Sequence, residues 1–219
     1  MPVKIDSREY RRIDASMMET RREEDGRMVV EGYATTFNQP YELMRDKDVI
    51  VNEQVDARAF DGTDMSDTIM QYDHEGRVFA RVKNGTLELT PDEHGLKVRA
   101  DLGGTEIGRQ LFEEIDGGYT NKMSFGFTVT GQKRERSKDG DGNTVILRTI
   151  TKVGRLFDVS AVSLPANDAT EISSRSIGDG LIAEVQEEVL AEQERQRKEQ
   201  QILEIRKLLN MEDENHENT

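Results

Sequence analysis

Hydrophobic and polar side chains alternate with a period of two in a succession of short segments from residue 28 onward. A β-strand has this period, because successive side chains point to opposite faces of a sheet. The segments with this pattern or with strand composition are 28–37, 69–72, 78–82, 86–90, 96–102, 121–130, 144–153 and 156–164. Many short strands of this kind predict an antiparallel β-barrel or β-sandwich decorated by helices.

Turn residues separate these strands. Asn84-Gly85 predicts a tight hairpin between the strands on either side of it. A second turn sequence at 91–95 follows, so we expect a meander of three strands over 78–102. Lys138–Asn143 predicts a longer hairpin loop; it is rich in Asp and Gly but lacks the distal Glu and the spacing of an EF-hand calcium loop.

Helical spacing appears at fewer places. The segment 105–116 has its apolar residues at helical spacing, and Gly117-Gly118 can end a helix there. The acidic segment 46–66 shows little periodicity, and we expect a loop with a short helix around Asp56–Phe60.

The C-terminal part of the chain has the character of a helical tail. Residues 181–219 contain no Gly or Pro, and eleven acidic residues against five Lys or Arg give this segment a net charge of −6. Its apolar residues recur at helix-compatible spacing, but the polar stretch 191–201 interrupts them. We expect either two short docking faces or a solvated helix with no partner.

These patterns divide the chain into three parts. Residues 1–25 mix Arg and Glu with few apolar side chains and predict a flexible N-terminal arm. Residues 26–172 form the β-rich core with its flanking helix, and 173–219 a linker and acidic helical tail. The predicted fold is therefore mainly β with helices, of the α+β class.

Composition excludes several classes of protein. The formal net charge of −14 argues against a nucleic-acid partner, which needs clustered Lys and Arg. The absence of Cys excludes disulfides and thiolate sites, and no metal or other cofactor is expected. The N-terminus lacks a signal-peptide h-region, and no run of about 18 apolar residues occurs, so we expect a cytoplasmic protein that does not span a membrane.

The segment Asn121–Val129 holds the first candidate for chemistry. Met123, Phe125 and Phe127 fall on one face of the predicted strand, and Ser124 falls on the other beside Gly126. A glycine at this place allows another chain to approach the serine. Ser124 is therefore a candidate nucleophile; the alternative is an ordinary polar residue on the solvated face of a strand.

A general base near neutral pH is most often a histidine, and the chain has three. His216 lies in the polar tail and His94 in a polar turn, so we expect both to be inert. His74 follows the apolar strand 69–72 and precedes a Gly-containing turn, where a scaffold can hold a side chain at the rim of a groove.

Asp158 interrupts an otherwise apolar strand and needs a hydrogen-bonding partner if it is buried. A His ring would serve, so Ser124, His74 and Asp158 can form a set of nucleophile, base and orienting group. The alternative is a strand-edge Asp paired with Arg155 or a backbone amide. Ser160 and Ser163 are weaker candidates for the nucleophile, because neither has an adjoining glycine.

Four segments in this order resemble the prohead maturation serine proteases of tailed bacteriophages, over residues 28–172. They are Val30–Ala34, the strand end at His74, Lys122–Phe127 and Asp158–Asn167. The resemblance implies a fold similar to the herpesvirus capsid-maturation protease: a β-barrel protease domain over 26–172, ringed by helices. By this resemblance His74 is the base and Ser124 the nucleophile; members of the family often have Glu where this chain has Asp158.

The resemblance also implies a function. Such a protease assembles inside an immature capsid in the host cytoplasm, where it cuts the scaffold or the scaffold-like N-terminal segment of the major capsid protein, and often itself. The helical tail would then dock onto scaffold, and the herpesvirus analogy implies a homodimer. Backbone amides near Ser124 or near Gly154-Arg155 are candidates for the oxyanion donors.

Two other functions are compatible with the sequence. A non-enzymatic scaffolding or assembly protein would carry the same β-domain and helical arm, with Ser124 and His74 incidental. A small-molecule esterase is disfavoured, because the Gly-x-Ser-x-Gly elbow of the α/β-hydrolases is absent around Ser124.

Overall fold

In a computed structural model, the chain is described over residues 8–13, 18–162, 177–184, 187, 191 and 194–202. It divides into two compact units, Met1–Gly178 and Asp179–Thr219. The elements of the first unit are β1 (Arg8–Ile13), β2 (Glu19–Arg22), β3 (Met28–Thr36), β4 (Tyr41–Asp46), β5 (Val49–Val55), β6 (Ile69–Tyr72), β7 (Glu75–Arg81), η1 (Val82–Asn84), β8 (Leu87–Pro91), β9 (Gly95–Asp101), α1 (Glu106–Asp116), β10 (Lys122–Lys138) and β11 (Thr144–Val162).

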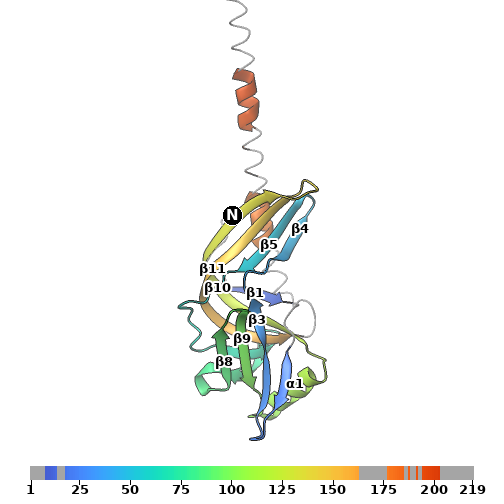
Figure 1. The fold of residues 1–219 in the computed structure, drawn as a ribbon, viewed down its shortest axis with the longest axis vertical. Helices are drawn as coiled ribbons and strands as arrows, with labels where there is room; N and C mark the ends of the chain where they lie inside the picture. The colour runs from blue at the N-terminus through green and yellow to red at the C-terminus, as the bar shows by residue number, and fades with distance from the viewer. Residues whose placement is uncertain are drawn as a thin grey trace, which may run out of the picture. The chain divides into compact units, whose positions relative to one another are not determined.

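The long antiparallel pair β10 and β11 lies at the centre of a seven-stranded sheet (Figure 1). The first half of β11 pairs with β5, and β5 pairs with β4. The second half of β11 pairs in parallel with β6, which forms a hairpin with β7. On the other side of the sheet, β1 pairs antiparallel with the first half of β10. β1 and β6, which come from distant parts of the sequence, therefore lie on opposite flanks of the β10–β11 pair near the start of β10.

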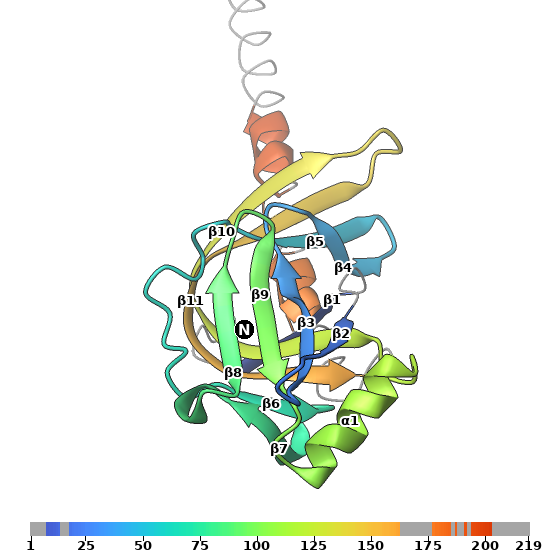
Figure 2. The same cartoon turned by 60° about the horizontal axis from the view of Figure 1, so that its bottom comes forward.

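A second sheet of four strands has the order β2-β3-β9-β8. Figure 2 shows it in front of the curved β10–β11 ribbon, with α1 beside it. Apolar side chains from both sheets and from α1 form one buried cluster, and these include Val30, Leu96, Phe112, Phe125, Phe127 and Val159. The predicted period-two alternation of these strands thus corresponds to a core between two sheets.

Helix α1 agrees with its prediction from the sequence. Thr105 caps its first turn, with its hydroxyl accepting a hydrogen bond from the Gly108 amide at 3.0 Å. Leu111, Phe112 and Ile115 form its buried face. Burial of each such side chain stabilises the fold by roughly 1.5–3 kcal/mol, so packing holds this helix in place.

The mainly β fold with helices is confirmed, but the sheets are not closed into a barrel. The seven-stranded and four-stranded sheets are separate hydrogen-bonded units. The two sheets join through side-chain packing in the shared core. Alternating apolar residues predict a buried face equally well for a barrel and for two packed sheets, so the pattern alone does not separate the two.

The predicted flexible arm over 1–25 is wrong for its described part. β1 pairs with β10, and β2 pairs with β3. Within β1, Glu9 and Arg11 are buried, although a charged segment predicts exposure. They are buried because each has a charged partner in the interior.

The segment 46–66 also differs from its prediction. β5 occupies residues 49–55, and residues 57–62 form turns in place of the short helix expected around Asp56–Phe60. The strand was not predicted because three polar residues interrupt its apolar pattern: Asn52, Glu53 and Gln54. Glu53 is fully buried against two arginines and so stands where the pattern requires an apolar side chain.

The predicted hairpin at Asn84-Gly85 is wrong. The chain does turn there, through η1 and Gly85 at φ 75°, but β7 pairs with β6 and β8 pairs with β9. The turn carries the chain from one sheet to the other, so the predicted meander over 78–102 is reduced to the β8–β9 pair. The tight hairpin lies earlier in the chain, at Asp73-His74 between β6 and β7.

Beyond the first unit, residues 194–202 are helical, and residues 177–184 form a helix at the boundary between the units. The remaining positions of the predicted tail lie largely outside the described residues. Within the part of the chain that the structure describes, no helix has both the length and the apolar character to cross a membrane.

Candidate active site

The three residues singled out from the sequence meet in one hydrogen-bonded line. Ser124 Oγ lies 2.6 Å from His74 Nε2. On the other side of the ring, His74 Nδ1 lies 2.5 Å from Asp158 Oδ1. All three side chains are at most 2% exposed. A hydroxyl, an imidazole and a carboxylate in this order are equipped for acyl transfer by a serine nucleophile.

Strand β10 places Ser124 as its alternation predicts. Met123, Phe125 and Phe127 point into the core and are fully buried. Ser124 lies on the opposite face and is itself only 1% exposed. The alternative of an ordinary serine on a solvated strand face is therefore wrong, because this face of β10 is covered.

The hairpin between β6 and β7 holds His74. Tyr72 pairs with Glu75, so Asp73 and His74 are the two central residues of the turn, with φ values of 47° and 61°. Positive φ at both central residues is the geometry of a type I′ turn, which suits a two-residue hairpin. The Asp73 amide donates to the carbonyl oxygen of Ala161 in β11 at 3.1 Å, which ties the turn to the strand that carries Asp158.

Asp158 reaches His74 across a place left open by a glycine. It lies opposite Gly126 of β10, next to a bulge at which the register between β10 and β11 shifts. A Cβ atom on Gly126 would come within 2.5 Å of Asp158 Oδ2. Ser160 Oγ donates to Asp158 Oδ1 at 3.0 Å. Because Gly126 has no side chain, the carboxylate of Asp158 can occupy this space.

The Asp158 carboxyl is held in its ionised form. Burial opposes ionisation, but the hydrogen bond and charge of His74, together with the charge of Arg8, outweigh it. The pKa of Asp158 therefore lies below its ordinary value. An ionised carboxylate can accept the Nδ1 proton of His74 and fix the tautomer that leaves Nε2 free to take a proton from Ser124.

Strand β1 contacts every member of this line. The Ser124 hydroxyl is also placed to donate to the carbonyl oxygen of Arg11, at 2.9 Å. The Tyr10 ring packs edge-on against the imidazole, with ring centroids 4.5 Å apart. The Arg8 guanidinium forms an ion pair with the carboxylate. The N-terminal strand therefore lies against all three side chains.

A buried cluster of four charges anchors β1 on its other face. Arg11 bonds Glu53 at 2.5 Å and Glu9 at 2.7 Å, and Arg148 bonds both of these glutamates. Tyr41 donates its hydroxyl to Glu53. Burial raises the pKa of Glu53, but the charges of the two arginines outweigh it and lower the pKa to about 2.

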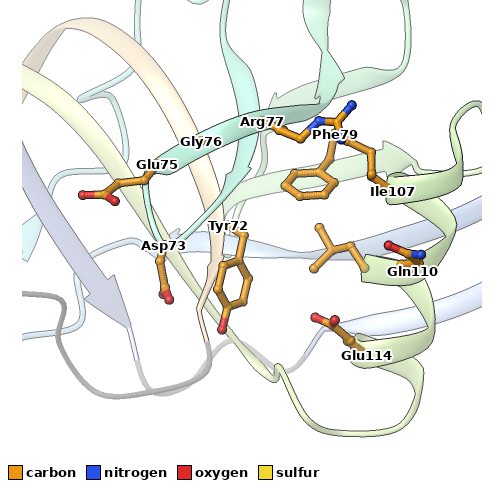
Figure 3. Close-up of a pocket in the computed structure, with 10 residues that line it drawn as sticks. Tyr72, Asp73, Glu75, Gly76, Arg77, Phe79, Ile107, Gln110 and Glu114 are labelled. Carbon is orange, nitrogen blue, oxygen red and sulfur yellow. The ribbon is translucent and has the colours of Figure 1, made fainter.

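A cleft of about 620 Å³ lies next to the turn that carries His74. Figure 3 shows β7 with Glu75 and Arg77 on one side and α1 with Gln110 and Glu114 on the other. Asp73, the neighbour of His74, lines the cleft, but His74, Ser124 and Asp158 are not among its lining residues. The cleft therefore lies beside the candidate site, and none of the three candidate side chains lines it.

The other residues considered from the sequence lie elsewhere. His94 is exposed in the β8–β9 turn, with its ring against Tyr33. Arg155 pairs with Asp64 at 3.6 Å and has no contact with Asp158 among the described interactions. His216 and Ser163 lie outside the described residues.

The amide of Arg155 is a poor candidate for an oxyanion donor. It donates to Thr128 Oγ1 at 3.2 Å and lies opposite Thr128 in the β10–β11 ladder. Thr128 is four residues from Ser124, or about 13 Å along a strand. The amides near Ser124 itself are closer to where an oxyanion would form.

Sequence reasoning missed Arg8 and Tyr10, which touch Asp158 and His74. Neither stands in an apolar pattern, because β1 buries charged side chains and pairs with β10 through its backbone. The sequence Arg8-Glu9-Tyr10-Arg11 gives no pairing partner. No group of three or more potential metal ligands is gathered within the described ranges.

Comparison with known proteins places this geometry in context. A family model for the caudovirus prohead serine proteases matches residues 16–181. Among solved structures, the capsid assembly protease gp21 of bacteriophage T4 is similar at 11% identity, with a TM-score of 0.40 over 72% of this chain and 99% of that one. A search of curated proteins found no match.

Proposed function

The chain belongs to the caudovirus prohead serine protease family, and on that premise we propose that it is a serine endopeptidase of capsid maturation. Its substrates are scaffold protein and the N-terminal segment of the major capsid protein, and it also cleaves itself. It acts inside the immature capsid. The observation that carries this proposal is the line of hydrogen bonds from Ser124 through His74 to Asp158.

In the proposed mechanism, His74 Nε2 takes the hydroxyl proton of Ser124 while Oγ attacks the carbonyl carbon of the scissile bond. The tetrahedral intermediate collapses to an acyl-enzyme when the same proton passes to the leaving amine. Water then attacks the ester, again with His74 as base, and Ser124 is restored. Asp158 orients the ring and stabilises the imidazolium that forms in each step.

Asp158 fills the third role because its carboxyl stays ionised at neutral pH. Its lowered pKa arises against the effect of burial, through His74 and Arg8. The substitution of Asp for the Glu often found in the family shortens the side chain by one methylene. Gly126 supports this role, since a side chain there would take the space of the carboxylate.

The partners follow from the same proposal. The protease meets scaffold and major capsid protein within the shell, and the acidic segment 181–219 docks onto scaffold. We also propose that the protease forms a homodimer, by analogy with the herpesvirus capsid-maturation protease.

The test is cleavage of co-expressed major capsid and scaffold proteins from the same phage. We compare wild type with Ser124→Ala and His74→Ala, and use Ser137→Ala, an exposed serine on the same strand, as the matched control. Discrete products with wild type and Ser137→Ala that disappear in the other two support the protease. Identical uncut patterns with folded protein throughout favour a non-enzymatic assembly protein.

A further inference from the structure

We propose that the edge of β10 beside Ser124 is a strand-addition site for the substrate polypeptide, and that β1 of the same chain occupies it as an internal competitor. This inference rests on the proposed function, because it concerns the regulation of the same site. The ligand class is an extended peptide that pairs antiparallel with β10.

β1 lies at the edge of the sheet, beside β10. β1 is the terminal strand of the order β1-β10-β11-β5-β4, and it covers β10 from Met123 to Thr128. If β1 leaves, the backbone N–H and C=O groups on this edge of β10 lose their partners. An extended peptide can replace them, which is how strand addition gives affinity without a fixed side-chain sequence.

β1 also contacts each of the three reacting groups. Arg8 holds the carboxylate, Tyr10 covers the imidazole and the carbonyl oxygen of Arg11 lies 2.9 Å from Ser124 Oγ. A serine hydroxyl has one proton, so a bond to the Arg11 carbonyl competes with the bond to His74. The closed arrangement therefore excludes substrate and also diverts the hydroxyl from its base.

β1 can leave without depriving a buried charge of its partner. Its departure removes Glu9 and Arg11 from the cluster, one charge of each sign. Glu53 and Arg148 remain in direct contact and balance one another. This matters because a buried charge left without its partner costs about 3–5 kcal/mol. The cluster is neutral with β1 and neutral without it.

The same holds at the candidate active site. When Arg8 leaves, Asp158 keeps its bonds from His74 and Ser160. The line of three residues comes from β10, β11 and the β6–β7 turn, so it is complete in the absence of β1. β1 thus behaves as an occupant of the site rather than as part of it.

The attachment of β1 is also of a kind that can be reversed. Its described side chains, at residues 8–11, are three charged groups and a tyrosine. Their contacts are ion pairs and ring contacts, and Arg8 is partly exposed to solvent. None of these four side chains is aliphatic, so at these positions opening breaks ion pairs and ring contacts, including those of Arg8 with Phe157 and of Arg11 with Phe127.

The test detaches β1 with the paired change Glu9→Ala and Arg11→Ala, which keeps the remaining cluster neutral. The measured quantity is the second-order rate constant for modification of Ser124 by a fluorophosphonate, in the full chain. If the closed form dominates by about ten to one, opening raises this rate about tenfold. The matched control is Glu42→Ala with Arg45→Ala, an exposed ion pair on β4, which should leave the rate unchanged.

A synthetic peptide with the sequence of residues 7–14 completes the test. Added to the paired variant, it should bind the vacated edge and return labelling to the slow rate, whereas the same peptide with Ala at positions 9 and 11 should have a much weaker effect. If the paired variant is unfolded by circular dichroism, Arg8→Ala with Tyr10→Ala serves instead, because these side chains lie outside the charge cluster.

These outcomes distinguish a failure of the role proposed for β1 from a failure of the proposed protease function. Equal labelling of wild type and the folded β1 variants would overturn β1 as a competitor while leaving the protease intact. Faster labelling that the peptide does not reverse would overturn the strand-addition site. No adduct on Ser124 in any folded variant would instead overturn the proposed function on which this inference depends.

Discussion

At the scale of single residues, the candidate site depends on a few side chains whose surroundings set their chemistry. Asp158 is fully buried yet ionised, because His74, Arg8 and Ser160 all favour its charged form. Its role in the proposed mechanism is to orient the imidazole. That role can be separated from simple packing by a change that keeps the shape and removes the charge.

We predict that Asp158→Asn lowers kcat on a capsid or scaffold peptide by roughly 10⁴-fold, as expected when an orienting carboxylate is lost and the wrong tautomer of the base is favoured. Asp64→Asn changes an exposed carboxylate that contacts Ser66 and Arg155; it is the control and should keep normal activity. Steady-state kinetics and a thermal melt on each variant make the comparison. A loss below tenfold in folded protein would contradict the assigned role.

Gly126 gives a second prediction at this scale. A Cβ atom there would lie 2.5 Å from the Asp158 carboxylate and 2.9 Å from the Tyr10 ring. Gly126→Ala should therefore displace the carboxylate from His74 and reduce kcat/KM by about 100-fold, a typical effect of misplacement by about 1 Å. Gly104→Ala, where the new Cβ meets nothing within 4 Å, should have normal kinetics. Equal activity in both variants would exclude a spacing role for Gly126.

The central residues of the site could be found from local sequence patterns. Ser124 lies on the polar face of an alternating strand, two residues from a glycine, and Asp158 is a charge within an apolar run. Tyr10 of β1 pairs with Gly126, and its ring lies 2.9 Å from where a Cβ atom on this residue would stand. Arg8 and Tyr10 could not be found, because their partners are fixed only by long-range strand pairing.

At the scale of elements, the β6–β7 hairpin determines where His74 lies. Its two central residues both have positive φ, which Asp and His tolerate better than most side chains and β-branched residues tolerate poorly. The hairpin was missed because the sequence placed the tight turn at Asn84-Gly85, the commoner signal for this geometry.

We predict that Asp73→Val destabilises the protein by about 1 kcal/mol, because a β-branched residue adopts left-handed backbone less readily than Asp, and that it also lowers kcat by moving His74. Asp73→Gly removes the same carboxyl but adopts positive φ without strain, so it should retain both stability and activity. Urea unfolding and kinetics test the pair. If the two variants behaved alike, the backbone conformation of the turn would have no part in positioning the base.

The buried charge cluster that joins β1, β5 and β11 predicts how stability depends on pH. Glu53 has a pKa of about 2 in the folded chain against an ordinary value of 4.5. Below pH 4.5 the unfolded chain binds the proton first, so stability is present above this pH and is lost as pH falls toward 2. The full contribution is roughly 3 kcal/mol.

Urea unfolding at pH 7 and at about pH 2 measures this effect. Glu53→Gln should lower the free energy of unfolding strongly at pH 7, because it leaves two buried arginines with one carboxylate. The difference in free energy of unfolding between wild type and variant should decrease sharply near pH 2. A constant gap across this range would mean that Glu53 is not the source of the dependence. The same cluster explains why β1 and β5 escaped sequence prediction: mutually neutralised charges are buried where a pattern search expects apolar residues.

At the scale of the whole molecule, the β-domain and the C-terminal segment are separate compact units. The mainly β fold and helix α1 could be predicted from periodicity, because the core residues lie on alternating positions. The arrangement into two unclosed sheets could not, because it depends on which strands pair across the chain.

We predict that deletion of residues 181–219 abolishes incorporation into proheads but spares peptide cleavage by the β-domain. The acidic tail would act only in docking, through its apolar positions and charge. Quantitative gel analysis of purified proheads, with a peptide assay and a thermal melt on the truncated chain, measures the two effects separately. Normal incorporation of the truncated protein would exclude a docking role for the tail.

The most direct measurement of the central claim is the mass-mapped site of fluorophosphonate modification in wild type and in the variant with Glu9→Ala and Arg11→Ala. We predict a single adduct on Ser124 in both, formed faster when β1 is detached, and none after His74→Ala. Folded protein with no adduct on Ser124 in either form would contradict a nucleophilic serine and leave a capsid assembly protein without protease activity.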